Sequence, residues 1–296
     1  MTAASAEAGS TERWAQLSLG AAILGVLLFS TGPAIIAEAE TNGLTIAFWR
    51  VVMGWGFVAL LTARQGGTPG GTYRQTMMAG VGFGTASALF FSAVQITSVA
   101  NAVLITVLQP VPLVLAGRVF FGERVKVTEA TWVAAAVAGA ALMVLSGSSA
   151  DTGDPAGDLL AVAAMLLTAV YFIGSKRARV TLPTLPFMVG LWFWAAVALA
   201  PILVVSGEGL LPASGGDWLR VAAIAALPGL GHYLTNFSHR GVSLAVVGVL
   251  QLFTPVGAAL LALWFLDQRI TTWQWLGMLV VIVSLAVYTT LHARNA

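Results

Sequence analysis

The dominant feature of the sequence is a series of ten apolar runs, separated by short polar or Gly/Pro-rich segments. A helix of about 20 residues spans the hydrocarbon core of a bilayer. Irregular backbone is not tolerated against lipid, so each run is expected to form one membrane-spanning helix. The expected helices cover residues 17–37, 44–63, 76–97, 99–121, 129–147, 158–175, 184–206, 218–238, 244–265 and 272–291.

Composition supports a membrane protein and excludes several other classes. Hydrophobic residues make up 58% of the chain and charged residues 9%, whereas soluble proteins carry about 25% charged residues. The net charge is only +2, and the charged residues lie between the apolar runs and do not form a basic face, so no nucleic-acid partner is expected. The chain has no cysteine, which excludes disulfides and thiolate metal sites. The expected partners are the lipid bilayer and a small-molecule substrate, and the expected state is a monomer or weak homodimer.

Basic residues predict the orientation. Eleven of the 14 lysine and arginine residues fall on the side of the N-terminus, whereas Arg220 and Arg269 fall on the other and Arg50 lies within a run. Such residues accumulate in cytoplasmic loops. Residues 1–13 do not resemble a cleavable signal peptide, so the first run is expected to stay in the mature protein. We therefore expect a multi-pass protein of the cytoplasmic (inner) membrane with both termini in the cytoplasm.

The chain repeats itself at an offset of 145 residues. Leu108-Gln109-Pro110-Val111 aligns with Phe253-Thr254-Pro255-Val256, and Phe120…Arg124 aligns with Phe265…Arg269. The halves 17–147 and 158–291 each hold five expected helices, an odd number, so the second half is expected to be inverted in the membrane. Inverted repeats are typical of transporters, because the halves exchange conformations when the open side changes.

The residues around these repeats resemble the drug/metabolite transporter superfamily, specifically its ten-helix EamA-type members. The resemblance rests on Phe120-Phe121-Gly122-Glu123-Arg124-Val125 with Thr131-Trp132, on Trp264-Phe265-Leu266-Asp267-Gln268-Arg269-Ile270 with Trp275-Leu276-Gly277, on Gln109-Pro110 and on Phe48-Trp49-Arg50. The second copy departs from the family pattern at Asp267-Gln268. The resemblance implies an all-α fold with helices around a central cavity, and export of amino acids or related metabolites. Within the family the chain looks most like the aromatic amino-acid exporters of the YddG type.

Polar residues next to two prolines are the first candidates for substrate contact. Each pair is spaced i, i+3 on one helical face, and the pairs are Thr106 with Gln109 and Gln251 with Thr254. Pro110 and Pro255 are expected hinges, because proline frees a carbonyl and bends the helix. The alternative is that these side chains only join helices to one another.

The eighth run combines a helix-breaking motif with polar residues. Pro228 and Gly229 predict a broken helix or hinge, and His232 and Asn236 share one face at i, i+4. His232 is expected to contact substrate or a proton, or else to be a neutral histidine bonded within the bundle. His239 lies at the cytoplasmic boundary, so no metal site is expected.

The remaining candidate residues are dispersed along the chain. Expected lining residues are Ser30, Tyr171, Trp194 and Tyr233, and Pro33 is an expected hinge. Arg50 has two interpretations. In the first, its side chain extends to the outer membrane boundary or pairs with Glu38 or Glu40. In the second, it binds a substrate carboxylate.

The expected function follows from what the membrane interior contains. No carboxylate lies in the middle of a run, so we expect either facilitated transport or a weak proton coupling through His232. No nucleotide- or phosphate-binding glycine motif is present, so no cofactor is expected. The chain is interpreted as a secondary transporter exporting aromatic or neutral amino acids. Alternatives are a multidrug or nucleoside exporter and, in other classes, a membrane-embedded enzyme or a channel.

Overall fold

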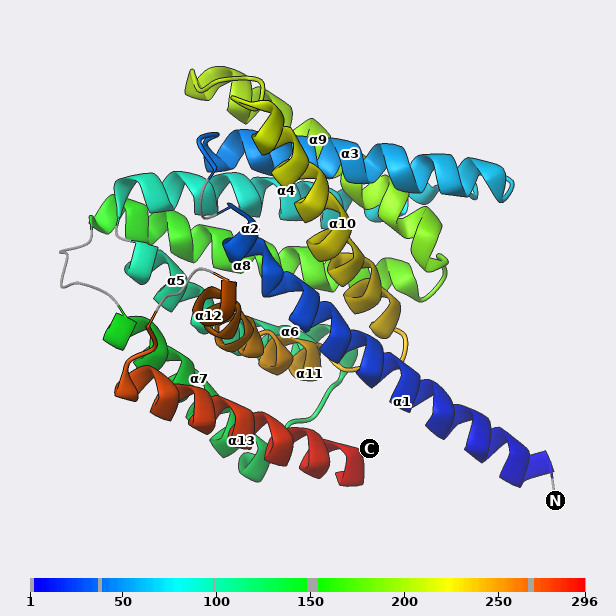
Figure 1. Cartoon of the computed structure of the whole chain (residues 1–296). Coiled ribbons are helices and arrows are strands. Elements are labelled where there is room, and N and C mark those ends of the chain that lie inside the picture. Colours follow the sequence, from blue (N-terminus) through cyan, green and yellow to red (C-terminus); the bar gives the residue numbers. More distant parts are fainter. Residues whose placement is uncertain (1–2, 37–38, 98, 148–153, 266–268, 296) are drawn as a thin grey trace.

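The computed structural model of the chain describes residues 3–36, 39–97, 99–147, 154–265 and 269–295, and these residues fold into α-helices with no strand (Figure 1). The helices are α1 (Ala3–Phe29), α2 (Thr31–Ile36), α3 (Gly43–Arg64), α4 (Thr72–Ile96), α5 (Val99–Val107), α6 (Pro110–Phe121), α7 (Val127–Gly147), α8 (Pro155–Arg179), α9 (Thr184–Ser206), α10 (Gly215–Ser238), α11 (Leu244–Leu250), α12 (Phe253–Phe265) and α13 (Thr272–Asn295).

Nine segments of the described chain are long and apolar enough to cross a membrane. They correspond to nine of the ten predicted runs. The tenth run, 218–238, is also a helix, α10, but it is less apolar because it carries Arg220, Pro228, His232 and Asn236. The chain is therefore a polytopic helical membrane protein.

The fourth and ninth predicted helices are each divided just before their proline. The predicted range 99–121 forms α5 and α6, and 244–265 forms α11 and α12. Because proline has no N–H, the preceding residue supplies the bond instead: Gln109 N–H donates to Thr106 O at 3.0 Å, and Thr254 N–H donates to Gln251 O at 3.0 Å. The two hydrogen bonds join residues that correspond at the 145-residue offset, so the two breaks are equivalent.

The other predicted hinges differ from each other. The first helix is interrupted at Ser30, where its hydroxyl donates to Val26 O at 3.1 Å, and Pro33 lies in the short α2 that follows. In contrast, α10 continues through Pro228 and Gly229, where the sequence predicted a break. A proline inside a helix removes one backbone bond but need not end the helix when neighbouring helices hold it.

Long helices pack in pairs around the bundle. Helix α4 lies along α8 and α9, α10 lies along α1, and α7 lies along α13, with α3 and α9 on one side of the bundle and α7 and α13 on the other (Figure 1). Glycines permit these close approaches. A Cβ on Gly84 would lie 2.6 Å from Ala195 O, and one on Gly174 would lie 2.8 Å from Ala79 N.

The two ends of the bundle differ in charge. We call one the basic end; here Gln75 bonds Thr181, Lys176 pairs with Glu123, and Arg240 bonds the Arg179 carbonyl. We call the other the acidic end; here Gln95 bonds Glu208 at 2.7 Å and Thr97 bonds Asp158 at 2.7 Å. Helix α1 begins and α13 ends toward the basic end (Figure 1). Near these ends the Trp14 ring contacts the Phe237 ring, with centroids 5.3 Å apart, and His292 Nε2 lies 3.5 Å from the Ser243 hydroxyl.

Asp217 fixes the beginning of α10 to the beginning of α3 at the acidic end. Its carboxylate accepts hydrogen bonds from the Thr41 hydroxyl at 2.6 Å, the Thr41 N–H at 3.0 Å and Arg220 Nη1 at 3.1 Å. These bonds, led by the Thr41 hydroxyl, lower the pKa of Asp217 from its ordinary value, although desolvation by burial acts in the opposite direction.

We expect the close helix contacts to limit side-chain size at Gly84. The Gly84→Ala variant places its methyl group against backbone of α9, and overpacking of this kind costs about 1–3 kcal/mol. Its melting temperature in detergent should fall below that of the parent. Gly56→Ala is the matched control, because a Cβ there meets nothing within 4 Å and alanine favours the helix. Equal melting temperatures for the two variants would contradict this packing.

We expect Asp217 to make stability depend on acid. The pKa of Asp217 is lower in the folded state than the ordinary value of 3.8, so its ionised carboxylate stabilises the folded state at pH values above 3.8. This stabilisation is lost as the pH falls through the pKa of the folded state. The Asp217→Asn variant should melt below the parent at about pH 7, and the gap should close below pH 3.8. The exposed Glu40→Gln variant is the control, and an Asp217→Asn gap that does not change with pH would refute the prediction.

Candidate functional site

A cavity of about 590 Å³ lies among α1, α2, α3, α4, α5, α8, α10, α11 and α12 and the breaks before Pro110 and Pro255. Its lining on α8 ends at Phe172, well before the helix reaches the basic end, whereas toward the acidic end it includes Phe91, Val103 and Ala164. The cavity therefore occupies the middle of the bundle and its acidic half. Six predicted substrate-facing residues line it together: Thr106, Gln109, Tyr171, His232, Gln251 and Thr254.

The two glutamines beside the helix breaks carry polar atoms without a partner. Gln109 is 7% exposed, and its Nε2 is buried with no hydrogen-bond acceptor. Gln251 Oε1 is likewise buried with no donor. Buried polar atoms are normally satisfied, so an unpaired donor and an unpaired acceptor in one cavity are suited to a polar ligand. Thr106 differs, since its hydroxyl donates to Val103 O at 2.7 Å.

His232 belongs to a small polar network at the base of the cavity. Its Nδ1 lies 3.4 Å from the Tyr171 hydroxyl, and Asn236 Nδ2 donates to that hydroxyl at 2.9 Å and to the His232 carbonyl at 2.8 Å. Asn236 is fully buried and does not line the cavity. Its role in this geometry is to orient Tyr171 and the α10 backbone.

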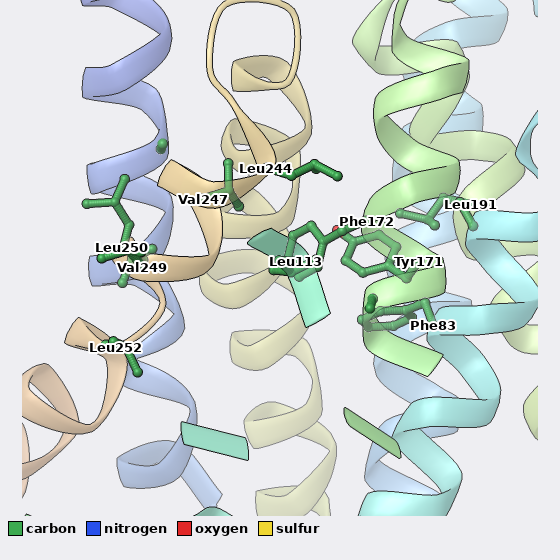
Figure 2. Close-up of a cluster of buried hydrophobic side chains, with 14 of the residues drawn as sticks. Phe83, Leu113, Tyr171, Phe172, Leu191, Leu244, Val247, Val249, Leu250 and Leu252 are labelled. Atoms are coloured by element: carbon green, nitrogen blue, oxygen red, sulfur yellow. The ribbon is translucent and has the colours of Figure 1, made fainter. Parts of the chain in front are cut away.

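Aromatic rings form much of the remaining wall, and the sequence did not single them out. Phe83 on α4 contacts His232 with centroids 4.8 Å apart and Tyr171 at 5.2 Å, and Phe29 contacts His232 at 4.6 Å. Figure 2 shows Phe83 beside Tyr171 and Phe172. The available sequence signal was spacing: Phe83, Ser87 and Phe90 share one face of α4 at i, i+4 and i+7.

Arg50 also lines the cavity. Its Nη2 lies 3.5 Å from the Ser87 hydroxyl, and its guanidinium carbon lies 5.4 Å from the centre of the Phe83 ring. Of the two acidic partners considered from the sequence, Glu38 lies outside the described residues, and Glu40 is exposed and makes no ion pair with Arg50 among them.

Several candidates lie outside the cavity lining. Ser30 is buried where α1 approaches Gly257 of α12, and Tyr233 packs against the hydrophobic core. Trp194 donates to the Tyr73 carbonyl at 2.7 Å between α9 and α4. Among the expected hinges, Pro33 and Pro255 line the cavity, whereas Pro110, Pro228 and Gly229 do not.

A network around Glu123 links three helices at the basic end of the bundle. The carboxylate pairs with Lys176 of α8 and accepts the Leu244 N–H at 3.0 Å, at the beginning of α11. An acidic group is stabilised there by the helix N-terminus. Lys176 in turn donates to the Val242 carbonyl at 3.2 Å and lies 5.2 Å from the centre of the Phe121 ring. This network joins the end of α6 to α8 and α11.

His239 lies near the Glu123 network and is 3% exposed, and neither of its ring nitrogens has a hydrogen-bond partner. Burial, followed by the charges of Lys176 and Arg179, lowers its pKa to about 3. His239 is therefore neutral at physiological pH, and no group of three or more potential metal ligands exists among the described residues.

Comparison with known proteins agrees with a polytopic helical bundle around a central cavity. The sequence model of the EamA-like transporter family matches residues 16–145 and again 155–290. A curated relative, the uncharacterized transporter YwfM of Bacillus subtilis (strain 168), is 23% identical over 272 residues, which cover 90% of this chain and 91% of the relative. One crystal structure superposes with a TM-score of 0.81 at 21% identity, covering 93% of this chain and 97% of the other, and shows the same fold.

These features define a multi-pass membrane transporter and not an enzyme. The protein belongs to the EamA-like transporter family, within the drug/metabolite transporter superfamily.

The Glu123 network should control access from the basic end. Because the chain lacks cysteine, a single Ser175→Cys substitution gives a specific label at a fully buried position on α8. We expect this cysteine to be protected from maleimide in the parent background and to react several-fold faster when Glu123→Ala removes the network. The control is Arg124→Ala, which changes an exposed neighbour. Equal labelling in both backgrounds would show that Glu123 does not hold this end closed.

Proposed function

We propose that the protein is a secondary transporter that exports small metabolites, and specifically aromatic or neutral amino acids, by alternating access. The observation that carries this proposal is the unpartnered amide pair, Gln109 Nε2 and Gln251 Oε1, within a cavity walled by aromatic rings. Amide and hydroxyl groups bind the polar end of an amino acid, and rings such as Phe83 pack against its side chain. The proposed substrate-contacting residues are those that line the cavity, with Asn236 supporting Tyr171.

Alternating access is supported by the matched halves of the chain. The proline breaks at α5–α6 and α11–α12 are equivalent at the 145-residue offset, and the family match falls on two segments of the chain. Helix α4 lies along α8 in the same manner as α10 lies along α1, which pairs the third helix of each half with the first helix of the other. We propose that α10 completes ten spans in two inverted repeats and that Pro110 and Pro255 act as hinges.

The basic end is proposed to face the cytoplasm, with both termini on that side of the inner membrane. The charge distribution supports this orientation. The cavity then lies in the outer half of the bundle, and the Glu123 network is proposed to close its cytoplasmic side. Closure at one end would distinguish a carrier from a channel, because a conducting channel is open at both ends.

Multidrug or nucleoside export by the same fold is the second candidate. The apolar cavity wall, with Phe29, Phe83, Phe90 and Phe91, favours amphipathic aromatic compounds in general. The amide pair is the feature that favours amino acids over purely apolar drugs, because a drug without matching polar groups leaves both amides unpaired.

We expect purified protein in proteoliposomes to transport radiolabelled phenylalanine, tryptophan or leucine with saturable kinetics. Gln109→Ala and Gln251→Ala should each lower the rate about tenfold or more, because a buried hydrogen bond to the substrate is lost. Gln16→Ala, on the exposed face of α1, is the control and should leave the rate unchanged.

The same vesicles decide how transport is driven. None of the described cavity-lining residues is Asp or Glu, which supports facilitated movement down the substrate gradient. Flux should therefore be insensitive to an imposed proton gradient. A strong dependence that is lost in His232→Gln would instead establish proton coupling through His232. Absence of amino-acid flux in folded protein, with flux of nucleosides or drugs, would reject the amino-acid assignment.

A further inference from the structure

Arg50 places an uncompensated cation in the cavity wall. Its Nη2 reaches the Ser87 hydroxyl at 3.5 Å, while its Nε is buried and has no hydrogen-bond partner. The described ion pairs, Lys176–Glu123 and Arg220–Asp217, and the His292–Glu129 contact do not involve Arg50. No described residue that lines the cavity carries a carboxylate. The charge of Arg50 therefore has no internal counter-charge in the described protein.

An isolated charge within a membrane protein is costly, and such groups usually pair with an acid or with a ligand. A side chain that only reached the membrane boundary would leave the cavity and approach the acidic end. Arg50 instead lies over the Phe83 ring, 5.4 Å from its centre, and beside Ser87 on the middle of α4. The position and the missing counter-charge both indicate that the ligand supplies the negative charge.

We propose that Arg50 and Ser87 form the anion-recognition site of the cavity and bind the carboxylate of the transported solute. A guanidinium presents two parallel N–H donors that match a carboxylate, and the Ser87 hydroxyl supplies a third donor. The adjacent Phe83 ring receives the apolar part of the same solute. This inference rests on the proposed function and narrows it: the substrate carries one carboxylate and an apolar or aromatic body.

The charge balance of the cavity sets its selectivity. One arginine neutralises one carboxylate, and no described acidic group is present to neutralise an amine. The ammonium group of an amino acid is accommodated by neutral acceptors such as Gln251 Oε1. Amines without a carboxylate are excluded because they would place a second cation beside Arg50, and dianionic phosphate esters are excluded because one cation is insufficient.

The test measures binding to the full chain in detergent, through intrinsic fluorescence and thermal shift. Trp192 provides a local reporter, with its ring 5.4 Å from that of Phe83. The probes share one aromatic body and differ in charge: phenylalanine, 3-phenylpropionate, phenethylamine and phenyl phosphate. Phenylalanine and 3-phenylpropionate are expected to bind, whereas phenethylamine and phenyl phosphate are not.

Variants assign the effect to the two residues. Arg50→Gln should weaken 3-phenylpropionate binding about tenfold to a hundredfold, which is the loss expected for a charged hydrogen bond, and Arg50→Lys should restore part of it. Ser87→Ala should weaken it several-fold. Arg64→Gln, which removes an exposed arginine from the same helix, is the control and should bind as the parent does.

Several outcomes would overturn the proposal. These are binding of phenethylamine as tight as that of 3-phenylpropionate, or carboxylate binding that is unchanged in both Arg50→Gln and Ser87→Ala. If Arg50→Gln does not fold, Ser87→Ala and the comparison of probes on the parent protein decide the question. Amino-acid flux that survives in Arg50→Gln would reject this site but leave the transport function standing. Carboxylate binding that depends on Arg50, without any amino-acid flux, would support this site but reject the proposed transport function.

Discussion

The need to pair every backbone polar group in lipid determines how this protein is built. Helices satisfy that need within each segment, so any interruption must be compensated locally. Two of the spans are interrupted just before a proline, which cannot donate, and the residue before each of these prolines donates to the carbonyl that is left. The breaks before Pro110 and Pro255 lie at the cavity, which is lined by Gln109 at the first and by Gln251 and Leu252 at the second. The same constraint therefore accounts for the helical bundle and for the position of its polar centre.

The second determinant is the close approach of helices at small residues. A bundle in lipid lacks the hydrophobic driving force of a soluble core, so van der Waals contact between backbones becomes important. Gly84 and Gly174 let α4 contact α9 and α8 directly. As a result α4 is held rigidly between two helices of the other half, and its Phe83 and Ser87 are placed against Tyr171 and Arg50. Packing of small residues thus positions the larger side chains of the site.

The sequence predicted the apolar helices well because their signal is local, namely length and hydropathy. It also singled out Gln109, Gln251 and His232, which line the cavity, because polar groups within apolar runs are rare. It did not predict that α10 continues through Pro228, since only the neighbouring helices decide whether a proline ends a helix. The aromatic wall was missed for a related reason: Phe29 and Phe83 resemble any lipid-facing phenylalanine until tertiary contacts place them beside His232. Trp194, chosen for its depth, lies between α9 and α4.

The Glu123 network has a consequence for the energetics of the empty protein. At the 145-residue offset, the position equivalent to Glu123 is Gln268, which is neutral. The carboxylate that binds a lysine and a helix N-terminus in the first half is thus aligned with a neutral amide in the second half. In a carrier that alternates between two states, an interaction present in only one of them shifts their populations. In the proposed alternating-access cycle, the unloaded protein would be biased toward the state that holds this network, and its apparent affinity for the same solute would differ between the two sides of the membrane.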